Sequence, residues 1–134
     1  MADRLGDGLA MTAVRINRGC TLRHLGRYDE AYDQFAAVLP EILAGDVPDA
    51  VLTACEDLAC VLFDMGRDRD AAVLVGAAVA EREATGVPRM AFQEAAVAPS
   101  FDGGRARIGE GWEPLLDRGR ELGVLAAVAM ALRP

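Results

Sequence analysis

The 134-residue sequence contains no lysine, and all 14 of its basic residues are arginine. This absence excludes mechanisms that form a Schiff base on lysine, and it excludes the phosphate-binding loop that requires Gly-Lys-Ser/Thr. Acidic residues outnumber basic ones by 21 to 14, which gives a net charge of −7. Because a surface of that sign repels phosphate backbones, we expect no direct binding to nucleic acid.

Histidine, cysteine and long apolar runs are also scarce. His24 is the only histidine, and Cys20, Cys55 and Cys60 form neither a C-x-x-C pair nor an even-numbered disulfide framework. We therefore expect no metal site, no cofactor and no catalytic residue, and we expect the cysteines to be buried small apolar residues. With no apolar run of the ~18–20 residues that span a membrane, and no secretory signal pattern, the expected location is the cytoplasm.

Aromatic residues make up only 5% of the chain, whereas hydrophobic residues, many of them alanine, make up 52%. This mixture favours closely packed helices over strands. Apolar residues recur at helical spacing in four segments separated by glycine and proline turns, with Asp7 and Asp49 placed to cap two of them. We predict helices over residues 9–25, 28–43, 50–65 and 68–85.

The C-terminal half is less regular. Residues 89–111 are predicted to form a short helix followed by a loop, because Pro99 and four glycines interrupt the helical pattern. Pro114 fits the first turn of a further helix that extends to about residue 122. That helix is expected to bury Trp112, Leu115, Leu116 and Leu122. Gly123 then separates a last apolar helix over residues 124–132, which suits a buried position or a self-association surface.

Two six-residue segments stand 40 residues apart at the same place in successive predicted helix pairs. The first reads GRYDEA over residues 26–31 and the second reads GRDRDA over residues 66–71. This spacing indicates an internal repeat, in which stacked helix pairs bury apolar faces that one pair alone cannot cover.

The first unit resembles a tetratricopeptide repeat at five of its diagnostic positions. These positions are Gly19, Gly26, Tyr28, Ala31 and Phe35. The second unit is more degenerate, with Asp68 where the family has an aromatic residue. A wider resemblance, over residues 71–78, 82–88, 107–112, 119–122 and 127–132, is to the final tetratricopeptide-like segment of large actinobacterial transcriptional regulators.

The resemblance implies a single all-α domain, a short right-handed array of antiparallel helix hairpins with a C-terminal helical cap. Its parts are repeat 1 at about residues 12–45, repeat 2 at about 50–86, an irregular segment at 87–111 and the cap at 112–134. The ATPase and DNA-binding modules of such regulators are not recognisable in this sequence. What the resemblance implies is therefore a non-catalytic protein–protein interaction or regulatory scaffold domain.

When the two repeats are aligned with the family pattern, polar and charged residues, acidic as well as basic, fall on the inner face of the array. They are Asn17, Cys20, Arg23, His24, Glu56, Cys60 and Asp64. The resemblance implies that a protein or peptide partner binds this groove. The lysine clamp of chaperone-tail receptors is missing, and a second copy of the chain or another of its own helices is an alternative cover for the same face.

Two other functions remain open at this point. A small-molecule-sensing domain could use the same groove, and a helical enzyme would need a cofactor to supply its chemistry. The acidic neighbours Glu56 and Asp57 are expected on a solvated face, because adjacent residues on a helix point apart.

Overall fold

The computed structural model describes residues 2–45 and 48–133, and it describes side chains over residues 10–45 and 49–133. It is all-helical, with no strand among these residues, as the composition predicts. The helices are α1 (Ala2–His24), α2 (Tyr28–Ala44), α3 (Pro48–Asp64), α4 (Asp68–Thr85), α5 (Ala91–Ile108) and α6 (Trp112–Ala131), with the 3₁₀ turn η1 (Gly109–Gly111) before α6.

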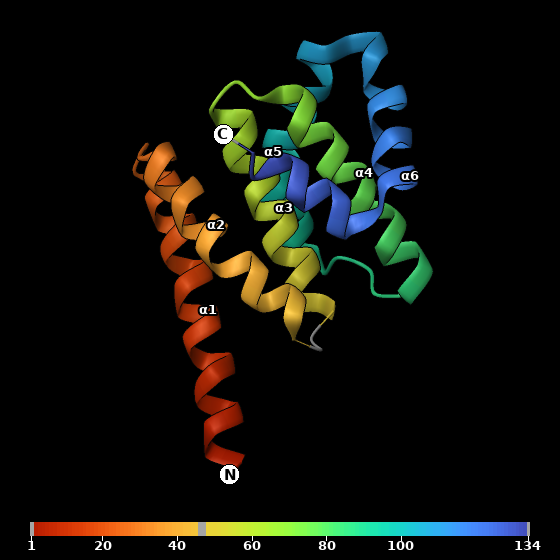
Figure 1. The fold of residues 1–134 in the computed structure, drawn as a ribbon. Coiled ribbons are helices and arrows are strands. Elements are labelled where there is room, and N and C mark those ends of the chain that lie inside the picture. The colour runs from red at the N-terminus through yellow and green to blue at the C-terminus, as the bar shows by residue number, and fades with distance from the viewer. Residues whose placement is uncertain (1, 46–47, 134) are drawn as a thin grey trace.

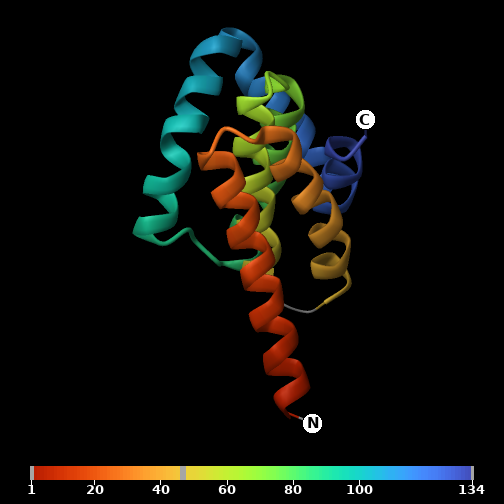
Figure 2. The ribbon, with the colours of Figure 1, turned by 90° about the vertical axis from the view of Figure 1, so that its left-hand side faces the viewer.

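Successive helices run in opposite directions, and α3 lies at the centre of the bundle (Figure 1). Helix α3 packs against α1, α2, α4 and α5, while α6 packs along α4. Turning the molecule shows α5 to the left and α1 passing in front of α3, with the N-terminal half of α1 projecting beyond the other helices (Figure 2). The predicted second, third and fourth helices are confirmed to within a few residues.

The two repeated segments adopt the same turn. Gly26 and Gly66 both take a left-handed backbone conformation, with φ of 77° and 81°, which glycine adopts without a steric penalty. The residue after each glycine donates its backbone N–H to a carbonyl five residues earlier, Arg27 to Leu22 and Arg67 to Leu62. The internal repeat seen in the sequence is therefore also a repeat of local backbone structure.

Helices α4 and α6 approach each other closely at two glycines, Gly76 on α4 and Gly119 on α6. A Cβ added at Gly119 would lie 2.0 Å from the carbonyl oxygen of Val73, and one added at Gly76 would lie 2.2 Å from the carbonyl oxygen of Leu116. Side chains at these positions would separate the two backbones, so the glycines permit the close packing of α4 on α6.

The expectation of a short helix and a loop over residues 89–111 is wrong, because α5 continues unbroken to Ile108. Val97, Phe101 and Gly104 recur at helical spacing and are buried, and Gly104 faces the ring of Phe63. Pro99 lies on the exposed side of the helix. Burial of this face overrides the local preference of proline and glycine for a turn.

Two smaller expectations are also corrected. Asp7 and Asp49 do not precede their helices, since α1 begins at Ala2 and α3 at Pro48. Leu122 is 36% exposed rather than buried. The prediction that Gly123 separates two helical segments is confirmed, because its backbone is non-helical, with φ of 79° and ψ of 169°, and this kink divides α6. This kink turns the final segment back across the bundle (Figure 1).

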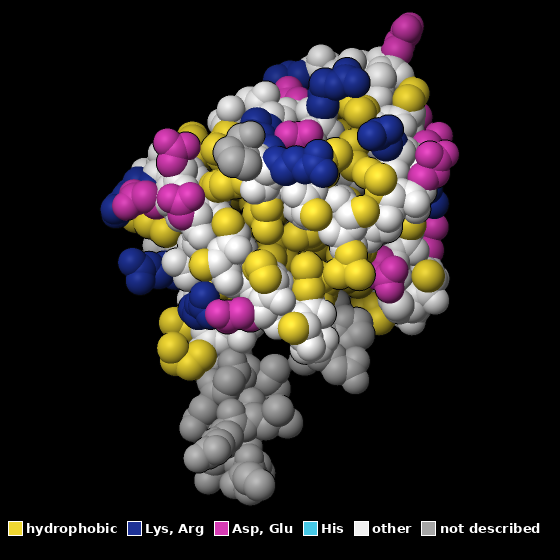
Figure 3. Space-filling model, in the orientation of Figure 1, with side chains coloured by type: hydrophobic (Ala, Val, Ile, Leu, Met, Phe, Trp, Pro, Cys, Tyr) yellow, Lys and Arg dark blue, Asp and Glu magenta, His cyan; other side chains and the backbone are white. Residues whose placement is uncertain are grey.

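The segment after the kink is partly buried and partly exposed. Ala127, Val128 and Ala131 are buried, whereas Leu125 is 70% exposed. Figure 3 shows hydrophobic side chains gathered at the centre of the face between α2 and this segment. Within the described part of the chain, no helix is long and apolar enough to span a membrane.

Candidate functional site

The site is a cavity of about 360 Å³ enclosed by α1, α3 and α5. Six of the seven groove residues predicted from the sequence line it, namely Asn17, Cys20, Arg23, His24, Glu56 and Cys60. The remaining walls come from Ile16, Phe35, Thr53, Asp57, Phe92, Gln93, Ala96 and Val97. These six residues on α1 and α3 therefore face one cavity.

Asp64, the seventh predicted residue, does not line the cavity. Its Oδ2 instead accepts a hydrogen bond from Arg23 Nε at 2.6 Å, and Arg23 Nη2 donates to Ser100 Oγ at 2.6 Å. These two bonds hold the Arg23 side chain between α3 and α5. Asp64 can therefore influence the cavity only through the position of Arg23.

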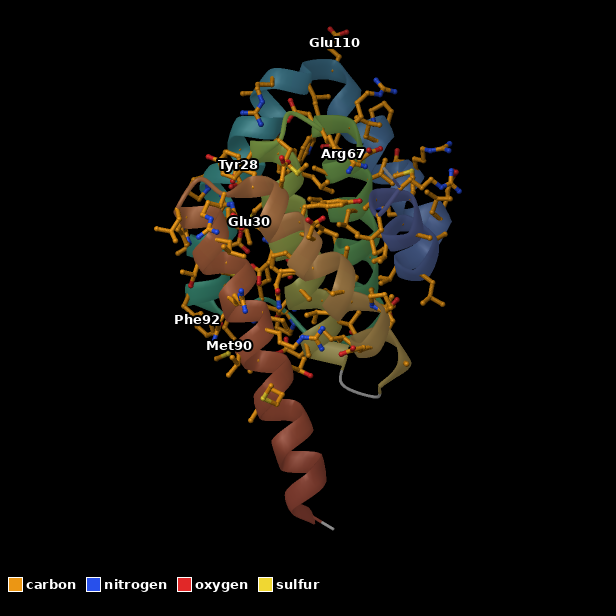
Figure 4. The ribbon with its side chains drawn as sticks, turned by 60° about the vertical axis from the view of Figure 1, so that its left-hand side comes forward. Tyr28, Glu30, Arg67, Met90, Phe92 and Glu110 are labelled. Atoms are coloured by element: carbon orange, nitrogen blue, oxygen red, sulfur yellow. The ribbon has the colours of Figure 1, made fainter. Side chains whose placement is uncertain are left out.

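Helix α5 closes the third side of the cavity, which sequence reasoning missed because only a short helix followed by a loop was expected over this segment. Gln93 Nε2 donates to Thr53 Oγ1 at 3.2 Å and connects α5 to α3. Phe92 stands at the opening and is 69% exposed. Figure 4 shows Phe92 and Met90 beside the middle of α1. The inner face of α1 and α3 is thus partly covered by a helix of the same chain.

Glu56 is fixed in place by arginine. It is only 2% exposed, and its Oε1 accepts hydrogen bonds from Nε and Nη2 of Arg82, the former at 3.0 Å. Its Oε2 lies 2.5 Å from Arg89 Nε, although the atom has no hydrogen bond of good geometry among the described side chains. The expectation that Glu56 faces solvent is wrong, because two guanidinium groups compensate its buried charge.

Asp57 is the acidic residue of the cavity that the sequence did not single out as functional. The pKa of its carboxyl is raised from 3.8 to about 6: burial is the largest cause and Glu56 adds to it, while a hydrogen bond with the Cys20 thiol and the charge of Arg23 oppose it. No ion pair to Asp57 occurs among the described residues. Helical spacing from Thr53 and Cys60, four residues before and three after, was the signal for this position.

The cavity cysteines are weak nucleophiles. Burial is the main cause that raises the pKa of Cys20 to about 12 and the pKa of Cys60 to about 11. Both thiols therefore stay protonated near neutral pH, where only a thiolate attacks or ligates strongly. All three cysteines are free: Cys55 and Cys60 are buried as predicted, and Cys20 is half-buried.

The remaining groups of the cavity suit binding. His24 is exposed at its edge, and the described residues contain no group of three histidine, cysteine or acidic side chains that could hold a metal ion. Amide, hydroxyl and carboxyl groups line the cavity together with apolar walls. This is the composition of a binding site, in which apolar surface supplies affinity and a few polar groups set orientation.

Comparison with known proteins gives no match: no protein-family model, no curated protein and no solved structure matches this chain. The case for function therefore depends on the cavity and on the residues that form it.

Proposed function

We propose that this chain is a non-catalytic protein–protein interaction domain that acts as a regulatory scaffold and is related to bacterial transcriptional regulators. The observation that carries the proposal is the cavity between α1, α3 and α5, lined by six residues that the repeat pattern placed on an inner face. In this proposal a protein or peptide partner docks at the opening and inserts a side chain.

The fold that goes with this function is a short right-handed tetratricopeptide-like array. Its two helix hairpins are α1–α2 and α3–α4, followed by α5 against α3 and by α6, within the predicted cap at residues 112–134, against α4. The matching turns at Gly26 and Gly66 and the packing of α3 against both α1 and α5 support this assignment. In such an array the odd-numbered helices form the inner, binding face.

The opening of the cavity has the exposed apolar surface that a partner needs. Met90 and Phe92, at the start of α5, are each more than half exposed. Aromatic and methionine side chains are the residues most enriched at the centre of protein interfaces. Phe92, which lines the cavity and projects from it, is the strongest candidate for an energetic anchor.

The test is affinity capture from a bacterial lysate with the wild-type chain, Phe92→Ala and Leu125→Ala. Phe92 and Leu125 are 69% and 70% exposed, so the two substitutions remove similar exposed surface, but Leu125 lies away from the cavity. The proposal predicts a partner that the wild type and Leu125→Ala retain and Phe92→Ala loses. Equal retention by all three chains would contradict docking at the cavity.

A small-molecule-sensing domain is the second candidate, and one observation favours it. Helix α5 converts an open groove into a cavity of about 360 Å³, which is within the size range of small-ligand sites. A metabolite that raises the unfolding temperature in the absence of any protein would support this function. A metabolite screen without such a compound, together with Phe92-dependent capture of a protein, would favour the interaction domain.

A further inference from the structure

We propose that the cavity between α1, α3 and α5 binds the primary ammonium group of an alkylamine, with the Asp57 carboxylate as its counter-ion. The inference rests on the proposed use of this cavity as a binding site, and it specifies the chemistry of what enters. The argument depends on the charges around the cavity, on the acceptors in its wall and on its apolar surface.

The other carboxylates near the cavity already have cationic partners. Glu56 is paired with Arg82 and Arg89, and Asp64 is paired with Arg23. Asp57 has only the neutral Cys20 thiol as a hydrogen-bond donor, and no ion pair to it occurs in the described part of the chain. Asp57 is half-buried, and a partly desolvated carboxylate without a cation has a cost that a cationic ligand would offset.

Arg23 does not serve as the missing cation. It lines the same cavity, but its Nε donates to Asp64 and its Nη2 donates to Ser100, each at 2.6 Å. Moving Arg23 toward Asp57 would break both bonds and leave Asp64 without its partner. The Arg23 guanidinium therefore connects α1 to α3 and α5 and is not available to pair with Asp57.

An ammonium group fits the acceptors of the wall better than other cations do. It carries three N–H donors, and Asn17 and Thr53 supply side-chain oxygens in the same lining as Asp57. Ile16, Phe35 and Val97 give the apolar surface that a short alkyl chain would cover.

The ammonium could belong to a free small amine or to a lysine side chain of the protein partner. The chain itself has no lysine, so none of its own side chains can supply this group. Both sources present the same four-carbon stem and primary ammonium, and both satisfy the proposal. They differ in what else binds, because a lysine peptide also reaches the apolar opening around Phe92.

The experiment measures thermal unfolding of the whole chain by circular dichroism in amine-free buffers, with n-butylamine, n-butanol or butyrate added. At about pH 8, where Asp57 is charged, butylamine should raise Tm by roughly 2–6 °C, and the alcohol and the acid should not. At about pH 5, where Asp57 is protonated, the butylamine effect should disappear. Nα-acetyl-lysine methylamide in place of butylamine tests the lysine source, with a larger shift expected if lysine is the natural group.

Two variants test whether the butylamine shift of Tm depends on Asp57. Asp57→Asn should abolish the butylamine shift, whereas Asp117→Asn, an exposed carboxylate on α6 with the same charge change, should keep it. The charged and titratable side chains near Asp57 are Cys20, Arg23, Glu56, Cys60 and Asp64, and imidazoles titrate between about pH 5 and 8. A His24→Asn variant that keeps the pH dependence therefore excludes the histidine that lines the cavity.

Equal shifts with butylamine and butanol would overturn the inference, as would a butylamine shift that is unchanged at the lower pH. The wild-type comparison across pH decides the question even if Asp57→Asn fails to fold. Loss of the amine effect with Phe92-dependent partner capture intact would reject the inference alone. Loss of partner capture with an intact amine effect would instead reject the protein-interaction function and leave ligand sensing.

Discussion

Glu56 of α3 and Arg82 of α4 form an ion pair that is almost entirely buried, with 2% and 6% of the two residues exposed. Arg82 also donates from Nη1 to the carbonyl oxygen of Val87 at 3.0 Å, and Arg89 approaches the other oxygen of Glu56. One carboxylate thus joins α3 to α4 and to the segment that leads into α5. The position of α5, and with it the third wall of the cavity, depends on this pair.

Glu56→Ala is expected to lower the free energy of unfolding by about 3–5 kcal/mol, because it leaves buried guanidinium charge unpaired. Urea denaturation monitored by circular dichroism measures the change. Glu94→Ala removes the exposed partner of Arg89, whose Nη1 lies 2.7 Å from Glu94 Oε2, and should cost less than about 1 kcal/mol. Similar losses for the two variants would show that the buried pair is not structurally important.

Asp57 gives the folded chain a distinct pH dependence. Burial raises the pKa of its carboxyl from 3.8 to about 6, so the folded state binds this proton more tightly than the unfolded state does. The contribution to stability is complete below about pH 4 and is lost as the pH rises through about 6. Asp57→Asn should remove this dependence and, at neutral pH, raise the free energy of unfolding by about 1–3 kcal/mol.

Urea denaturation of wild type, Asp57→Asn and Asp117→Asn across this pH range measures the Asp57 effect. The Asp117 variant controls for the change in net charge, because Asp117 is exposed on α6. Parallel pH profiles for the wild type and Asp57→Asn would contradict a desolvated carboxyl at this position.

Two glycine substitutions test the packing of α4 on α6. Gly119→Ala places a methyl group 2.0 Å from the Val73 carbonyl oxygen and should destabilise the chain by about 3 kcal/mol. At Gly103 of α5 the methyl group meets only the mobile end of Arg107, at 3.2 Å, so Gly103→Ala should be neutral or stabilise by up to about 1 kcal/mol. Equal Tm values for the two variants would show that α6 does not lie this close to α4.

Deletion of the chain from Val124 onward should give an aggregating or molten product. The deletion uncovers the surface that Ala127, Val128 and Ala131 bury, and it removes the Ala131 carbonyl oxygen that accepts from Tyr32 Oη and Arg67 Nη2. Binding of a hydrophobic dye together with loss of near-ultraviolet circular dichroism would identify such a state. A truncated chain that stays in solution and unfolds cooperatively would contradict the prediction.

The sequence was informative where local and long-range preferences agree. Glycine turns and apolar spacing located α2, α3 and α4, and the repeated turn at Gly26 and Gly66 supplied the register that placed Cys20 and Cys60 on one cavity. The all-helical class is confirmed, whereas the tetratricopeptide-like array and the interaction function stay predictions.

The sequence was misleading where packing decides the structure. Pro99 and Gly104 favour a turn locally, but burial of Val97 and Phe101 against the core holds α5 helical. Because only a short helix and a loop were expected here, the packing of α5 as a cavity wall with Phe92 and Gln93 was not predicted. Asp57 was missed for a related reason: its isolation from cations depends on where the arginines of other helices lie, which spacing along one helix does not reveal.

The central claim is that the cavity between α1, α3 and α5 is where this chain binds its partner. The most direct measurement is the Kd of the captured partner for purified wild type, Phe92→Ala and Leu125→Ala by isothermal titration calorimetry. Truncation of an aromatic anchor should weaken binding by about 2 kcal/mol, roughly 30-fold, while Leu125→Ala should match the wild type. An unchanged Kd for Phe92→Ala in a correctly folded chain would contradict the account.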